Sequence, residues 1–225
     1  MPKHLLHKWF QMFMPPAPFE PEALERAFLA DYCRRFARQR QIAALVGMAV
    51  NLPYMGWDYV FGIDDVRLAH AISDIRLLRI AIVLEVLPAL LLSLHRRFDT
   101  DERYATTIIV ATLVGQFGIY CRGLLLVPFP YDFMYFFMGM FIIQIYGFSL
   151  LRLRSWPVFT FLVVTLLIAA ATFAWKWHIH LGNTADPAER MYSWLALSFL
   201  VTVGAMGQVV GNMLERSERD NFERS

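Results

Sequence analysis

The chain has 225 residues, of which 57% are hydrophobic and 18% are charged, and its mean hydropathy is +0.43. A soluble domain is about 45–50% apolar and about 25% charged, so this composition excludes an ordinary soluble domain, a disordered chain and a disulfide scaffold. The net charge of +2 gives no sign of a nucleic-acid partner. The composition predicts an all-α membrane protein, with the lipid bilayer as its first partner.

Residues 1–40 are too polar to cross a membrane and form a predicted cytoplasmic N-terminal segment. Within it, Leu24, Phe28, Tyr32 and Phe36 recur every four residues and therefore share one helix face. Arginines cluster toward the end that adjoins the first apolar segment. The pattern predicts an amphipathic helix that lies at the membrane interface and runs into that segment. Such a helix can anchor the bundle, or contact a partner subunit or an output domain.

Six apolar segments between residues 41 and 214 are long enough to cross a bilayer core of about 30 Å, which takes about 20 residues. None alternates with period two, so we expect helices and not strands. The sequence predicts a six-helix transmembrane sensor domain with spans at Gln41–Phe61, Leu77–His95, Ala105–Val127, Tyr131–Leu150, Trp156–Trp175 and Met191–Leu214.

Beyond Leu214, residues 215–225 carry mixed charge and contain neither glycine nor proline. This pattern predicts that the sixth span continues into the cytoplasm as a signalling helix, the start of a coiled-coil linker that leads to a domain after Ser225. Near-heptad spacing puts Phe222 on the dimer face of that helix. Within the span, Gly204, Gly207 and Gly211 allow close helix approach, either inside one chain or between two chains of a homodimer.

Fifteen of the 21 Lys and Arg residues fall on the side of the two termini. Cytoplasmic loops of membrane proteins are enriched in these residues, so both termini are predicted to be cytoplasmic.

Two ionisable residues lie at membrane depth, where charges are costly and usually functional. Glu85 in the second span and Arg122 in the third are close enough in expected depth to pair. The pair can fix the helix register, or it can form the polar floor of a ligand pocket that faces outward. Gln116 lies two turns below Arg122 and is a further candidate to line the pocket. The fourth span is rich in Phe and Met and includes Tyr135; it is either plain packing or the wall of a pocket for a hydrophobic ligand.

Three histidines, His70, His178 and His180, are predicted on the outer side among several carboxylates. Together they can bind a transition metal or a haem. His178 and His180 are two residues apart, so they can share a metal only where the chain is extended.

The run "LERSERDNFERS" after six short-looped spans resembles the linker between the membrane region and the catalytic domain of bacterial nucleotide cyclases, of the class III adenylate cyclase or diguanylate cyclase type. The resemblance implies a homodimeric sensor or anchor in the bacterial inner membrane. It would pass a signal down span six to a downstream cyclase domain. No cyclase catalytic motif occurs in these residues, so the chain itself is expected not to be an enzyme.

The leading hypothesis is a receptor that binds a small apolar or amphipathic ligand from the outer side. The alternatives are a haem- or metal-binding membrane sensor and a small membrane transporter.

Overall fold

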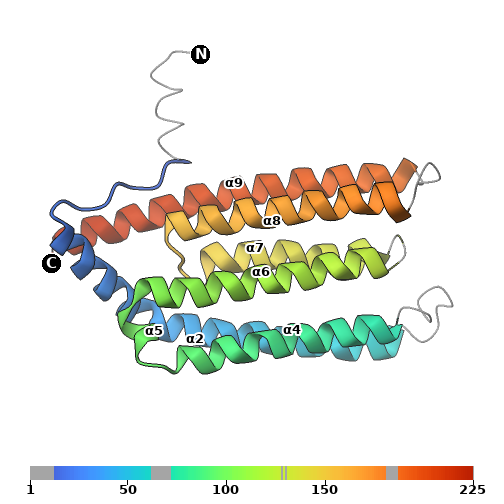
Figure 1. Cartoon of the computed structure of the whole chain (residues 1–225), viewed down its shortest axis with the longest axis horizontal. Helices are drawn as coiled ribbons and strands as arrows, with labels where there is room; N and C mark the ends of the chain where they lie inside the picture. Colours follow the sequence, from blue (N-terminus) through green and yellow to red (C-terminus); the bar gives the residue numbers. More distant parts are fainter. Residues whose placement is uncertain (1–12, 62–71, 128, 130, 181–186, 225) are drawn as a thin grey trace, which may run out of the picture.

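The computed structural model describes residues 13–61, 72–127, 129, 131–180 and 187–224. These residues form helices and connecting turns, with no strand among them. Figure 1 shows the helices: α2 (Glu22–Phe61), α4 (Ile72–Ser93), α5 (Arg97–Thr100), α6 (Glu102–Leu126), α7 (Met138–Ser149), α8 (Ser155–Trp175) and α9 (Pro187–Glu223). Two π-helical turns adjoin them, η1 (Phe133–Phe137) before α7 and η2 (Lys176–His180) after α8.

The long helices lie alongside one another in a single bundle (Figure 1). α2 packs on α4, α4 on α6, α6 on α7 and α8, and both of these on α9. α6 therefore occupies the middle of the bundle, and its buried residues Leu113, Phe117 and Leu124 form much of the core. The helix begins sharply because the Asp101 side chain accepts the backbone N–H groups of Arg103 and Tyr104, which the first helical turn leaves without partners.

Three helical segments are long and apolar enough to cross a membrane: Glu102–Leu126, Ser155–His178 and Pro187–Glu223. Large apolar side chains point outward from the bundle, for example Leu77, Leu167 and Met206, which are each more than 60% exposed. Such a surface suits lipid and not water. The chain is therefore an all-helical membrane protein.

The other predicted spans are also helical, but they are less clearly membrane-spanning. α4 carries Arg76, Arg79 and Glu85 within its 22 residues. α7 has only 12 residues, because the π-helical turn η1 precedes it. The crossing of the membrane by all six segments stays a prediction.

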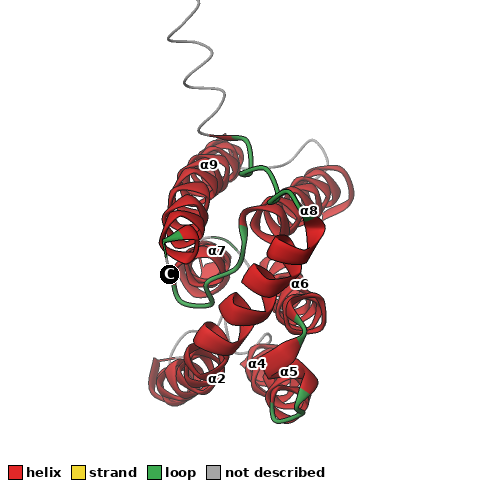
Figure 2. Ribbon diagram, turned by 90° about the vertical axis from the view of Figure 1, so that its left-hand side faces the viewer, coloured by secondary structure: helices red, strands yellow, loops and turns green. Residues whose placement is uncertain are grey.

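The first half of α2 crosses one end of the bundle, as Figure 2 shows in the view onto that end. Its residues Phe28, Tyr32 and Phe36 are buried, and they pack with Phe19 and with Phe222 near the end of α9. The predicted helix and its apolar face are present, but this face is covered by the chain itself. This contact forms because α9 extends far enough to bring Phe222 onto this face.

Candidate functional site

A cavity of about 390 Å³ lies between α2, α6 and α7, with one wall residue from α4. We call it the lateral cavity. A volume above about 300 Å³ is typical of pockets for small ligands. The lining residues are Val46, Gly47, Val50, Asn51, Tyr54, Arg79, Gln116, Tyr120, Met138, Gly139, Ile142, Ile143, Tyr146 and Leu150.

The rim and the floor of the lateral cavity differ in character. The rim residues Val46, Val50, Met138 and Ile142 are apolar and between 39% and 52% exposed. They stand where α2 and α7 face each other, so the opening is directed sideways, toward the expected position of the lipid. The floor contains the polar groups, among which Arg79 is only 2% exposed.

Tyr120 is held in the floor by two contacts. Its hydroxyl donates to Asn51 Oδ1 at 3.2 Å, while Asn51 Nδ2 donates to the carbonyl oxygen of Gly47 at 2.8 Å. Its ring lies on Gly139 so closely that a Cβ on this glycine would be 2.1 Å from the ring. The missing side chain at residue 139 is therefore what allows the tyrosine to pack against α7.

Arg79 is a functional candidate that the sequence analysis missed. Its guanidinium group lies 5.3 Å from the ring centroids of both Tyr54 and Phe136, within the range of cation–π attraction. It also lies within hydrogen-bonding reach of Tyr120. The signal was present in the sequence, because an arginine two turns inside an apolar helix is rare without a specific role.

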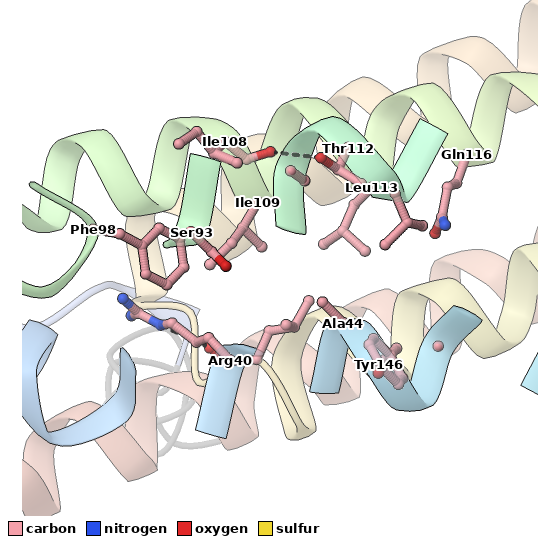
Figure 3. A pocket seen from close by; sticks show the side chains of 14 residues that line it. Arg40, Ala44, Ser93, Phe98, Ile108, Ile109, Thr112, Leu113, Gln116 and Tyr146 are labelled. Atoms are coloured by element: carbon pink, nitrogen blue, oxygen red, sulfur yellow. Dashed lines mark hydrogen bonds between the residues drawn. The ribbon is translucent and has the colours of Figure 1, made fainter. Parts of the chain in front are cut away.

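A smaller pocket of about 50 Å³ continues the lateral cavity toward the end at which α2 begins (Figure 3). The two share Gly47, Gln116 and Tyr146. Such a volume suits a few water molecules.

Arg40 lines the far end of this smaller pocket. Its guanidinium donates to both oxygens of Glu102, at 2.8 Å each, and both side chains are buried. A bidentate pair of this kind fixes α2 against α6. The same guanidinium and the Tyr32 hydroxyl both donate to the carbonyl oxygen of Arg152. The backbone of Arg152 has a left-handed φ of 47°.

The predicted pairing of Glu85 with Arg122 is wrong. Glu85 lies against Gly115, its Oε2 atom is buried, and this atom has no hydrogen-bond partner among the described residues. Arg122 is exposed and lies seven residues farther along α6, which is about 10 Å at 1.5 Å per residue. The expected depths failed because α4 begins at Ile72, five residues earlier than predicted, so Glu85 lies deeper in the bundle. Neither residue lines the lateral cavity.

Among the other residues predicted to bind the ligand, Gln116 does line the lateral cavity, whereas the side chain of Tyr135 lies outside the described residues. The Phe- and Met-rich stretch forms one side of a separate apolar groove against α9. This groove is lined by Phe133, Phe137, Met138, Phe141, Tyr192, Leu195, Ala196 and Phe199.

The predicted metal or haem site is not assembled by the part of the chain that the structure describes. No group of three His, Cys, Asp or Glu residues with metal-binding geometry occurs there. His70 and the side chain of His180 lie outside the described residues, and His178 is exposed. The backbone of Lys176–His180 is a π-helical turn. The extended backbone that would let His178 and His180 share a metal is therefore not present there, because apolar helix α8 continues directly into this turn.

The glycines of α9 face the same chain. A Cβ on Gly207 would be 2.3 Å from the Phe148 ring, and one on Gly204 would be 3.2 Å from Leu162. Gly211 has ordinary spacing, 3.9 Å, to Val158. These three glycines thus pack α9 against α7 and α8. Of the two predicted possibilities, this is close helix approach inside one chain and not between two chains of a homodimer. Phe222 also packs within the chain, against Phe19 and Phe28.

A cluster of charges joins α2 to the end of α9. Arg219 of α9 donates to Glu25 of α2 at 2.7 and 3.0 Å and to Glu215 at 3.0 Å, and Arg154 donates to both of these carboxylates. We call these four residues the α2–α9 ionic cluster. The rings of Phe19 and Phe28 cover Arg219 at 4.8 and 4.6 Å.

Glu25 of this cluster has a lowered pKa. Its burial raises the pKa, but the hydrogen bonds from Arg219 and from the backbone N–H of Phe19 outweigh that effect, so the net shift is downward.

At the opposite end of the bundle, Lys176 forms ion pairs with Asp132 and with Glu189, the latter at 2.8 Å. All three side chains are less than 10% exposed. They connect the segments before α7, after α8 and at the start of α9. Asp132 lies at the start of the predicted fourth span, whereas Lys176 and Glu189 lie between the fifth and the sixth, so the sequence does not show that the three meet.

No protein-family model matches the chain, and neither a curated protein nor a solved structure matches it.

Proposed function

We propose that this chain is the sensor region of a membrane signalling protein. In this proposal its six segments cross the bacterial inner membrane, both termini are cytoplasmic, and a small amphipathic ligand occupies the lateral cavity. The chain itself has no catalytic role. Binding changes the position of the cytoplasmic end of α9, and an output domain of the nucleotide-cyclase type reads that change in a homodimer.

The observation that carries the proposal is the course of α2. This helix runs without a break over 40 residues, from Glu22 to Phe61. Its second half lines the lateral cavity from Val46 to Tyr54, and its first half holds the end of α9 through Glu25 and Phe28. The centres of these two regions are about 35 Å apart along the helix axis. A ligand that displaces α2 at the cavity therefore acts on α9 through one rigid element.

In this proposal the homodimer contact lies on the outward face of α9, because the glycines of this helix already pack within the chain. This face presents Trp194, Phe199, Met206 and Met213, each more than half exposed.

The test measures the distance between the two helices at the α2–α9 ionic cluster. Cysteines replace exposed residues Arg26 on α2 and Asp220 on α9, and spin labels on them report the distance by pulsed electron resonance in lipid nanodiscs. The two native thiols, Cys33 and Cys121, are buried, so the added cysteines label selectively. Val50→Trp fills the cavity rim and mimics occupancy; Leu52→Trp is the control, because Leu52 is 58% exposed and does not line the cavity.

The proposal expects Val50→Trp to shift or broaden the distance distribution and Leu52→Trp to leave it unchanged. Identical distributions in both variants would show that the cavity and the α9 end are not coupled.

Transport is a second candidate, and the shared residues of the two pockets favour it. Together the pockets reach from Tyr54 near one end of the bundle toward Arg40 near the other. A transporter would move a cavity ligand across sealed liposomes, whereas a sensor would bind it without flux. Uptake of a radiolabelled amphipath into proteoliposomes, compared with that into empty liposomes, separates these functions.

A further inference from the structure

We infer that the lateral cavity takes its ligand from the bilayer and that this ligand is a single-chain amphipath whose head carries hydrogen-bond-accepting oxygens. This inference rests on the proposed function in that it names the ligand of the same site. The sequence predicted that the ligand enters from the outer side. We infer instead that the ligand enters laterally from the bilayer, between α2 and α7.

The first argument is the direction of the opening. Val46, Val50, Met138 and Ile142 form an apolar rim and are 39–52% exposed, while the buried floor holds Asn51 and Arg79 at 9% and 2%. A molecule in the bilayer thus meets an apolar rim first. A water-soluble ligand would have to desolvate its polar groups at this rim before it reached any partner, which is costly.

The second argument is the chemistry of the floor. Tyr146 Oη is buried beside the backbone of Gly47, and its hydroxyl donates to no acceptor among the described residues. A buried hydroxyl without an acceptor is costly, so a ligand oxygen placed there would satisfy it. Figure 3 shows Gln116 on α6 and Tyr146 on α7 facing the same gap. Arg79 and Gln116 add further N–H donors, so the floor favours an acceptor such as a carboxylate or a carbonyl oxygen.

The third argument is size. The cavity follows α2 from Val46 to Tyr54, eight residues or about 12 Å. Its volume of about 390 Å³ accommodates one apolar chain of that length with a small head. A two-chain phospholipid would not fit inside it.

The experiment uses the full chain in nanodiscs and a fatty acid that carries a photoreactive diazirine on its chain. After illumination, mass spectrometry maps the labelled peptides. The inference expects labels on residues 46–54 and 138–150, and about a ten-fold loss of these labels in Val50→Trp but not in Leu52→Trp. Tyr146→Phe keeps the ring and removes only the hydroxyl, and it should weaken labelling about two- to ten-fold.

Competitors test the headgroup. Dodecanoic acid and methyl dodecanoate both present a carbonyl oxygen, whereas dodecane presents none. Competition by the acid, the ester or both, but not by dodecane, supports the inference. Stronger competition by the acid than by the ester would show that the cavity recognises the negative charge of the carboxylate. Equal competition by dodecane, or labels spread evenly over all lipid-facing helices, would overturn it.

The labelling is independent of the distance measurement on α2 and α9. A chain that is labelled as expected but shows no distance change would retain the ligand site and lose the proposed signalling role. A chain with the distance change but without specific labelling would retain the signalling role and lose this ligand class.

Discussion

At the scale of single residues, the buried ion pairs are grouped at the two ends of the bundle. Lys176 lies with two carboxylates at one end, and Arg40 and Arg219 lie with theirs at the other. Removing one partner of a buried pair costs more than the pair contributes, because the remaining charge stays desolvated. Substitutions of these residues therefore test how strongly the ion pairs hold the helices together at each end of the bundle.

Glu25→Gln tests the α2–α9 ionic cluster through pH. The pKa of Glu25 is lowered below its ordinary value of 4.5, so its contribution to stability is present above that value. It is lost as the pH falls through the lowered pKa of the folded state. We expect thermal unfolding in detergent to show a fall in Tm below about pH 4.5 that is smaller in Glu25→Gln. At neutral pH the variant should lose about 2 kcal/mol, because charge-assisted hydrogen bonds are removed.

The matched control for this prediction is Glu22→Gln. Glu22 lies one turn earlier on the same helix, and its side chain is 85% exposed. The Glu22→Gln variant should leave unchanged both the Tm at neutral pH and the dependence of Tm on pH. If Tm fell equally below about pH 4.5 in Glu25→Gln and in the unaltered protein, the role assigned to Glu25 would be contradicted.

Lys176→Met tests the opposite end. It leaves Asp132 and Glu189 as two buried carboxylates without their cation, and we expect a loss of about 3–5 kcal/mol, seen as a large drop in Tm. Arg190→Met is the control, because Arg190 neighbours Glu189 in the chain but is exposed. Adding Asp132→Asn and Glu189→Gln to Lys176→Met should recover most of the loss. No recovery would mean that the lysine acts through packing and not through charge.

At the scale of elements, α9 shows how one helix serves several contacts. Its small residues meet α7 and α8, its charged end meets α2, and its large apolar residues point outward. The glycine spacing alone predicts close helix approach, but it does not say which helix approaches.

Gly207→Ala and Gly211→Ala separate the tight contact from the loose one. The new Cβ at residue 207 would be 2.3 Å from the Phe148 ring, so α7 or the ring must shift, and we expect a loss of about 1–3 kcal/mol. At residue 211 the nearest atom is 3.9 Å away, and alanine should be neutral or slightly stabilising. Thermal unfolding of the two variants measures the difference. Equal Tm values would show that α7 does not pack on α9 at residue 207.

At the scale of the whole molecule, the bundle combines three segments that are long and apolar enough to span a membrane with helices that carry polar groups. The polar groups of α2 and α4, notably Asn51 and Arg79, face the lateral cavity. These two side chains lower the hydropathy of their helices and are placed where they line the cavity.

The six-span topology predicts alternating accessibility. Single cysteines at exposed Arg97 and Arg103 should react with a membrane-impermeant maleimide only after the inner membrane is opened. Exposed Arg190, near the other end of the bundle, should react in intact cells after the outer membrane is permeabilised. Reaction of all three positions in intact cells would contradict the prediction that the termini are cytoplasmic.

The sequence by itself determined the helical class and the approximate bounds of the helices. Hydrophobicity is a local property, and about 20 apolar residues in a row specify a buried or membrane helix whatever surrounds them. The four-residue spacing of Leu24, Phe28, Tyr32 and Phe36 is likewise a local property, and α2 does run from Glu22 through the first apolar segment.

Only the tertiary structure decided which polar residues meet. Glu85 and Arg122 share an apparent depth in the sequence, yet α4 begins five residues earlier than predicted and Glu85 packs against Gly115, seven residues before Arg122 on α6. Arg79, Asn51 and Tyr120 come from three helices and form one cavity floor, which no local pattern reveals. Contacts between helices depend on their rotation and relative height. Both follow from close approaches such as Tyr120 on Gly139 and Phe148 on Gly207, which exist only once the helices are packed.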